Sequence, residues 1–369
     1  MFTSRPTTAN TMKINLVSEH GTTSDQTFYC PGSVIQGSVS LSFSKKVDPT
    51  RVRLVFEASE GINLSTATPG AVSNRLNNLF RVQSTLWEKN ESDQLTESDY
   101  TFPFNIQLPM VQFPPSMDEI TYRCVYRLTA YLDLSKSRQG IITLAQKKIN
   151  FVPFIETAIL KSPLTEEITR NGIRMVTKLT SLNYVSGDKI PISLRFSTAK
   201  NKPVSLSIKL SQIINFITDE EYPLEKTTMV SSSRVLAAGT TYHETCLEIP
   251  SDTSPTFDYG RMISVSYILK ITMGHKYCAG LLQSSEVSVE LPIHIGTLGC
   301  GIRPPDDLKM YTIFLKSSSA RSSDSTSDFG LEPIPPPRFL KLVEYENALP
   351  VYTPERLPDY SSVRSGVHV

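Results

Sequence analysis

Apolar and polar residues alternate strictly along much of this chain. Val39, Leu41 and Phe43 share one side of a segment whose other side carries serines. The same alternation recurs at residues 52–56, 102–108, 120–132, 190–196, 204–210, 263–271 and 287–295. Side chains two positions apart lie on the same face of a strand, so each segment would bury one face and leave the other in water. The sequence therefore predicts an all-β fold built from antiparallel sandwich strands.

The alternating pattern also occurs twice. Residues of the first half recur in the same order in the second half, and the recurring pairs are Tyr29 and Tyr184, Gly32 and Gly187, Ile35 and Ile190, Pro109 and Pro250, Pro114 and Pro255, Tyr126 and Tyr267, and Leu128 and Leu269. We interpret the repeat as two tandem immunoglobulin-like β-sandwich domains, at residues 12–155 and 163–300. The first domain would carry an extra loop at residues 59–81. Chance similarity between β-rich segments is the alternative.

Charge and cysteine content exclude several classes of protein. The formal net charge is +1, which offers no general attraction to nucleic acid or to an anionic membrane. The first ten residues lack an apolar signal-peptide core, and no segment is long and apolar enough for stable membrane insertion. The five cysteines are scattered and odd in number, which is typical of reduced thiols. We expect a cytoplasmic protein with no nucleic-acid partner.

No pattern of residues indicates an enzyme. The five histidines show no metal-site or triad spacing, and His275 and Cys278 would point to opposite faces of a strand. The glycines at residues 296–301 precede Pro304 and Pro305, where a phosphate-binding loop would need the start of a helix. The sequence therefore predicts no catalytic residue, no cofactor and no metal. An unrecognised site on a β-sandwich is the alternative.

The composition changes at residue 316. Residues 317–327 are rich in serine, and the chain after them is rich in proline. Such a segment has little apolar surface to offset the entropy of ordering, so residues 316–369 are predicted to be a disordered tail. Ser322, Ser323 and Ser325 are candidate phosphorylation sites, and a plain linker is the alternative. The prolines at 335–337 are interpreted as a stiff spacer, with a ligand for a proline-reading domain as the alternative.

The tail holds two copies of the pattern Leu-Pro-x-Tyr. Proline favours the polyproline II conformation, so proline and tyrosine reach an aromatic-lined groove with little entropy left to lose. WW domains bind peptides in this way, and two nearby copies suit a partner with tandem WW domains. About a tenth of one copy is expected by chance. The predicted WW-binding residues are Leu349, Pro350, Tyr352, Leu357, Pro358 and Tyr360.

These features together resemble the α-arrestins, a family of arrestin-fold trafficking adaptors. The resemblance is carried by residues 29–37, 100–109, 120–132, 184–192, 263–269 and 289–296. With the tail motifs it extends over nearly the whole chain. It implies two tandem arrestin-type sandwich domains followed by the tail.

The resemblance also implies partners. An α-arrestin binds a membrane transporter or receptor as cargo, and its tail recruits a HECT-type ubiquitin ligase that contains WW domains. The cargo is then ubiquitylated and internalised, so the adaptor is drawn to the plasma membrane or endosomes through its cargo. By position, ligase recruitment falls on the six residues of the two Leu-Pro-x-Tyr motifs.

The chain departs from the family in three ways. Neither motif is the preferred Pro-Pro-x-Tyr, the tail is short, and the sequence does not reveal the charged core of the receptor-binding arrestins. Phosphate-triggered activation of the kind found in those arrestins is therefore not assumed. The alternative function is that of an arrestin-fold scaffold or coat-type sorting subunit, like the arrestin-like subunit of retromer, that recruits no ligase.

Overall fold

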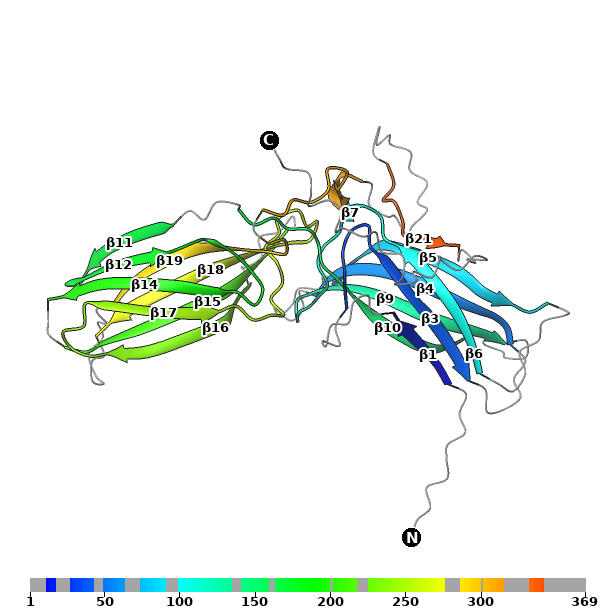
Figure 1. Cartoon of the computed structure of the whole chain (residues 1–369), viewed down its shortest axis with the longest axis horizontal. Helices are drawn as coiled ribbons and strands as arrows, with labels where there is room; N and C mark the ends of the chain where they lie inside the picture. The colour runs from blue at the N-terminus through cyan, green and yellow to red at the C-terminus, as the bar shows by residue number, and fades with distance from the viewer. Residues whose placement is uncertain are drawn as a thin grey trace, which may run out of the picture.

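The protein consists of two elongated β bodies that lie end to end (Figure 1). The computed structural model describes residues 11–17, 27–42, 49–63, 74–90, 99–134, 141–158, 163–199, 202–217, 225–275, 286–299, 301–314 and 332–341. Within these ranges, no helix has the length and apolar character needed to cross a membrane.

The first domain is a sandwich of two sheets. One sheet has the order β1-β3-β6-β21, formed by Thr11–Leu16, Val34–Ser42, Asp99–Gln107 and Arg338–Leu340. The other has the order β2-β10-β9-β4-β5, formed by Phe28–Tyr29, Ile141–Phe151, Tyr122–Leu134, Pro49–Asn63 and Asn74–Glu88, with β8 (Met117–Asp118) beside β9. The core lies between these sheets. On β3, for example, Val39 and Leu41 are buried while the serines between them are half-buried.

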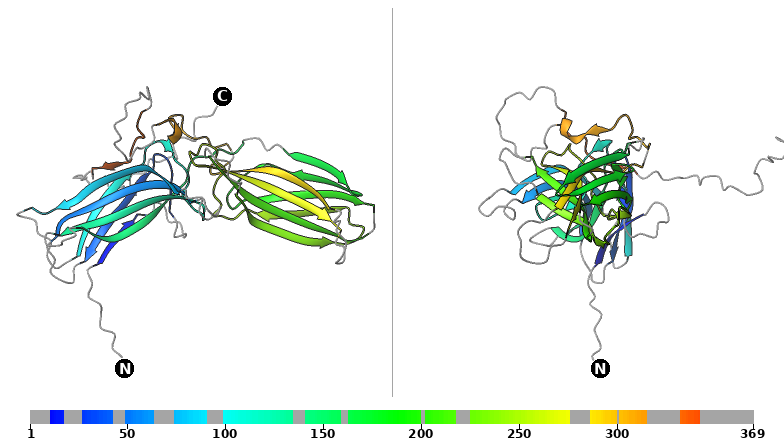
Figure 2. Two further views of the ribbon diagram at one scale, coloured as in Figure 1. Left: turned by 180° about the vertical axis from the view of Figure 1, so that it is seen from behind. Right: turned by 90° about the vertical axis from the view of Figure 1, so that its left-hand side faces the viewer.

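The second domain repeats this architecture. One sheet has the order β11-β12-β14-β17, formed by Leu164–Arg170, Ile173–Leu179, Lys189–Thr198 and Tyr242–Glu248. The other has the order β13-β19-β18-β15-β16, formed by Asn183–Val185, Glu286–Gly296, Ile263–Gly274, Val204–Phe216 and Glu225–Leu236. In both domains the short second strand of the repeat pairs in parallel with the last long strand. The predicted all-β fold with two tandem sandwiches is confirmed (Figure 2).

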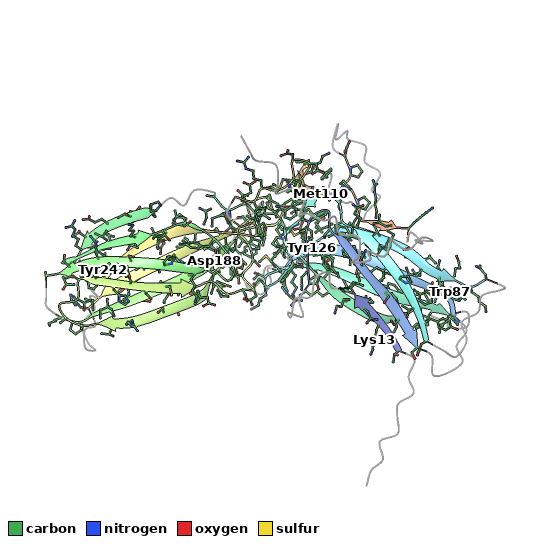
Figure 3. The ribbon with its side chains drawn as sticks, viewed as in Figure 1. Lys13, Trp87, Met110, Tyr126, Asp188 and Tyr242 are labelled. Atoms are coloured by element: carbon green, nitrogen blue, oxygen red, sulfur yellow. The ribbon has the colours of Figure 1, made fainter. Side chains whose placement is uncertain are left out.

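Residues that the repeat predicts to be equivalent play equivalent parts. Gly32 and Gly187 both adopt a positive φ, of 76° and 87°, which glycine reaches without steric cost. The hydroxyl of Tyr126 donates a hydrogen bond to the carbonyl of Pro114 at 2.7 Å, and Tyr267 does the same to Ser254 at 2.5 Å. Both tyrosines are buried in the central strand of their sheets. Figure 3 shows Tyr126 near the end of the first domain that faces the second.

The predicted loop at residues 59–81 is wrong in its extent. Most of that segment belongs to β4 and β5, which pair as far as Asn63 and Asn74. The extra length of the first domain is spread over both strands, their connection and the connection from β5 to β6. The polar composition of the segment suggested a loop, but a hairpin with one solvent-exposed face also tolerates polar residues on that face.

After the second domain the chain returns to the first. A short strand, β20 (Lys309–Met310), pairs in parallel with β7 (Val111–Gln112) of the first domain. The turn η2 (Tyr311–Ile313) follows directly. We call residues 301–314 the return segment.

The prediction of a wholly disordered tail at residues 316–369 is also corrected in part. Residues 332–341 are ordered, and β21 adds a strand to the edge of β6. Composition indicates only how much apolar surface a segment could bury by itself. Here the first domain supplies the partner strand, β6, and Ile334 and Pro337 are buried. The prolines at 335–337 are therefore not a free spacer.

Candidate functional site at the domain junction

The sequence-predicted site residues lie outside the described part of the chain. This holds for Leu349, Pro350, Tyr352, Leu357, Pro358 and Tyr360, and for Ser322, Ser323 and Ser325. In the described part, a set of buried polar contacts lies where the two domains meet.

The linker between the domains, residues 153–158, is held from both sides. Gln112 of the first domain uses its side-chain amide twice on Phe154: Nε2 donates to the carbonyl at 2.6 Å, and Oε1 accepts from the N–H at 3.0 Å. Thr297 of the second domain donates to the carbonyl of Pro153 at 2.6 Å and accepts from the N–H of Ile155 at 2.8 Å. The linker is therefore a fixed joint.

Close packing reinforces this joint. A Cβ atom placed on Gly296 would lie 2.5 Å from Cγ2 of Thr157 and 2.8 Å from the carbonyl oxygen of Ile155. Only glycine lets the end of β19 approach the linker this closely. The hydroxyl of Thr157 in turn donates to the carbonyl of Leu298 at 2.9 Å.

The return segment places Tyr311 between the two domains. Its side chain is fully buried, at 0% exposure. The ring lies 6.2 Å from that of Phe113 in the first domain and 6.5 Å from that of Tyr259 in the second, measured between ring centroids. Tyr259 also reaches across the junction, donating its hydroxyl to the carbonyl of Phe113 at 3.2 Å. Tyr311 thus belongs to an aromatic cluster that both domains share.

Arg261 of the second domain holds Tyr311 in place. Its Nη2 donates to the carbonyl of Tyr311 at 2.8 Å and to that of Phe314 at 2.5 Å, and its backbone N–H donates to the hydroxyl of Tyr311 at 2.7 Å. The guanidinium also lies 4.9 Å from the centroid of the Tyr311 ring, within the range of a cation–π interaction. A tight turn at Gly260 presents Arg261, since a Cβ there would lie 2.1 Å from the carbonyl of Ile263.

Glu60 of the first domain completes the network. It follows Phe56 and Ala58 in the inward-facing phase of β4, and its side chain is 1% exposed. The carboxylate accepts hydrogen bonds from Asn77 at 2.9 Å and from the hydroxyl of Tyr122 at 3.2 Å. The hydroxyl of Tyr311 lies 3.4 Å from each of its oxygens. A buried charge on the first domain is therefore tied to the return segment.

Burial, hydrogen bonds and a nearby charge together set the pKa of Glu60. Burial raises the pKa of Glu60, and the hydrogen bonds from Asn77, Tyr122 and Tyr311, with the nearby charge of Arg261, offset part of the rise. Burial also raises the pKa of the hydroxyls of Tyr122 and Tyr311, so both remain neutral donors. The positive charge of Arg261 lowers the pKa of Glu60 without a direct ion pair, and Tyr311 contacts both residues.

The network is suited to holding the domains together. Glu60, Tyr122 and Tyr311 are closed to solvent, so a substrate would not reach them. Burial also raises the pKa of the neighbouring Cys124 thiol, which keeps it in the unreactive form. In the described part of the chain, no group of three or more histidine, cysteine or carboxylate side chains could hold a metal ion. We name the set of Glu60, Tyr122, Arg261 and Tyr311 the junction network.

Sequence reasoning missed the junction network. One signal for Glu60 was available, because it occupies an apolar position in the alternation Phe56, Ala58, Glu60, Ile62, and a charge in that phase indicates a buried partner. No comparable signal marked Arg261 or Tyr311. Their roles depend on three segments that are far apart in the sequence.

Comparison with known families identifies the second domain. Residues 169–300 match the family model described as arrestin (or S-antigen), C-terminal domain. The match runs from within β11 to just after β19 and so covers the second sandwich. A comparison with curated proteins found no match. The chain is thus an arrestin-fold protein whose second sandwich is an arrestin C-terminal domain.

Proposed function

We propose that this protein is a trafficking adaptor that links a membrane cargo, such as a nutrient transporter or receptor, to a HECT-type ubiquitin ligase with WW domains. Arrestins generally act as trafficking adaptors, and an arrestin C-terminal domain is present here. The observation that carries the proposal is the pair of Leu-Pro-x-Tyr peptides that follows this domain in the same chain.

The two parts of the chain have separate tasks in this proposal. The arrestin-fold body selects the cargo and is drawn by it to the plasma membrane or endosomes. The tail peptides recruit the ligase through its WW domains, and the ligase performs the chemistry. Ubiquitylation of the cargo then promotes its endocytosis.

The test is a double substitution, Tyr352→Ala with Tyr360→Ala. Each tyrosine fills the second pocket of a WW domain, so we expect co-precipitation of the ligase to be lost and cargo ubiquitylation to fall. Tyr345→Ala is the matched control, because Tyr345 lies in the same tail outside both motifs. Persistence of ligase binding in the double variant would show that the tail peptides are not the recruiting element.

A second candidate is an arrestin-fold scaffold or coat-type sorting subunit that recruits no ligase. The observation that favours it is Leu349 and Leu357, which stand where the preferred ligand has a second proline. The two functions differ in the same experiment. A scaffold would keep its partners and its cargo turnover when both tyrosines are replaced.

A further inference from the structure

The first domain binds a segment from the far end of the chain. Strand β21 pairs antiparallel with β6, with Arg338 opposite Gln107, Phe339 opposite Ile106 and Leu340 opposite Asn105. Among the strands that the structure describes, none from the second domain pairs with this segment. Figure 1 shows β21 against the first domain and away from the second.

Side-chain contacts hold β21 in place, in addition to its backbone pairing. Ile334 is 9% exposed, Pro337 is buried, and Phe339 packs against the core of the first domain opposite the fully buried Ile106. Arg338 and Leu340, on either side of Phe339, are exposed. The segment therefore presents alternate side chains to the sandwich, as a bound peptide does when it adds a strand to a sheet.

We propose that residues 332–341 are a tail anchor, which holds the ligase-binding peptides at the β6 edge of the first domain. The anchor itself is argued from the contacts of β21. What it delivers rests on the proposed function of the Leu-Pro-x-Tyr motifs. The β6 edge is thus a peptide-binding site whose ligand is an extended, proline-containing segment of this same chain.

The anchor restricts how far the peptides can move. Leu349 follows Leu340 by a short stretch that can extend to at most ~30 Å. If the anchor were released, the nearest attachment would be Phe314 in the return segment. The root-mean-square reach to Ala348 would then roughly double, from about 16 Å to about 32 Å. The effective concentration of the peptides near the first domain would fall about ninefold.

The anchor also determines which partner domains can bind the prolines at 335–337. With Pro337 buried next to the paired strand β21, a proline-reading domain cannot enclose this run while β21 is paired. The two Leu-Pro-x-Tyr motifs follow the anchor in the sequence. The anchor therefore directs the partner to the downstream peptides and to the side of the first domain.

The experiment measures the distance between the first domain and the tail in the full chain. Site-specific labels are placed at Lys13, which is exposed on the same sheet, and at Ala348. Phe339→Asp places a charge in the packed position, and Leu340→Asp places the same charge one residue away on the exposed side. Ile334→Asp removes a second, independent contact of the anchor. A tandem WW-domain protein is titrated into each variant in parallel.

We expect the distance distribution to broaden about twofold in Phe339→Asp and Ile334→Asp and to stay unchanged in Leu340→Asp. Binding of the WW protein should be the same in all of them. An unchanged distribution in both packed-position variants, or equal broadening in Leu340→Asp, overturns the anchor. If the distances shift as expected but the WW protein fails to bind the unsubstituted chain, the anchor stands and the ligase function falls.

Discussion

The hydroxyl of Tyr311 lies 3.4 Å from both carboxylate oxygens of Glu60, although 251 positions separate the two residues in the chain. Tyr311 comes from the return segment and Glu60 from β4 of the first domain. The same hydroxyl accepts the backbone N–H of Arg261 in the second domain. One tyrosine therefore connects both domains and the segment that follows them.

The first prediction concerns Tyr311. Tyr311→Ala removes a fully buried ring and should lower the free energy of unfolding by about 3 kcal/mol. Tyr311→Phe keeps the ring and loses only the hydroxyl contacts, so a decrease of about 1 kcal/mol is expected. Denaturant unfolding followed by fluorescence measures both. Equal losses in the two variants would show that the hydroxyl rather than the ring matters.

The second prediction concerns pH. Because burial raises the pKa of Glu60, the folded protein holds this proton more tightly than the unfolded chain. Stability therefore falls as pH rises from the unfolded-state pKa through the folded-state pKa. Glu60→Gln keeps a polar group that cannot ionise, so this fall should be absent from its profile of melting temperature against pH. Glu57→Gln, on the outer face of the same strand, should retain the slope of the unsubstituted protein.

The third prediction concerns the attachment of the return segment. Arg261→Lys supplies a charge but cannot donate to two carbonyls while lying over the Tyr311 ring. A loss of about 1.5–3 kcal/mol of charged hydrogen bonding should raise the open population of residues 301–314 by about tenfold or more. Limited proteolysis of the native protein would detect faster cleavage there. Arg234→Lys, at an exposed position on β16, is the control and should leave cleavage unchanged.

The fourth prediction concerns the linker. Thr297→Val preserves shape but removes the hydroxyl that bonds Pro153 and Ile155, at a cost of about 1–3 kcal/mol in unmet buried hydrogen bonds. We expect a wider range of interdomain distances by small-angle X-ray scattering. Thr272→Val, on the outer face of β18, should scatter like the unsubstituted protein. Identical curves for both variants would mean that the Thr297 hydroxyl is not needed to fix the joint.

The fifth prediction concerns thiol reactivity. Cys124 is buried, and burial raises its pKa, whereas Cys246 is exposed. A maleimide reagent added to the native protein should therefore modify Cys246 and leave Cys124 unmodified until denaturant is added. Peptide mass spectrometry distinguishes the two sites. Native labelling of Cys124 would mean that the first domain opens on the timescale of the reaction.

Much of the fold was predictable because its signal is local. Val39 and Leu41 are buried and the serines beside them are more exposed to solvent, as alternation alone predicts. The repeat located equivalent turns because Gly32 and Gly187 both need a positive φ. Each of these features can be recognised from a few neighbouring residues.

The junction network was beyond such reasoning for a physical reason. Glu60 lies in a polar stretch of sequence, and such a stretch indicates a loop unless the register of β4 with β5 is known. That register depends on the whole sheet. Arg261 and Tyr311 gain their roles only when the chain has returned to the first domain. The anchor at Phe339 was missed likewise, because its stabilising surface belongs to β6.

The chain crosses between the domains twice, once through the linker at residues 153–158 and once through the return segment. Direct contacts join the two domains as well: the hydroxyl of Tyr259 donates to the carbonyl of Phe113, and the hydroxyl of Thr121 donates to the carboxylate of Glu225. A rotation of one sandwich against the other therefore strains hydrogen bonds at the linker, at Arg261 and at these two contacts. A cargo that spans both sandwiches must fit the angle that the junction sets, or supply the free energy to break those contacts.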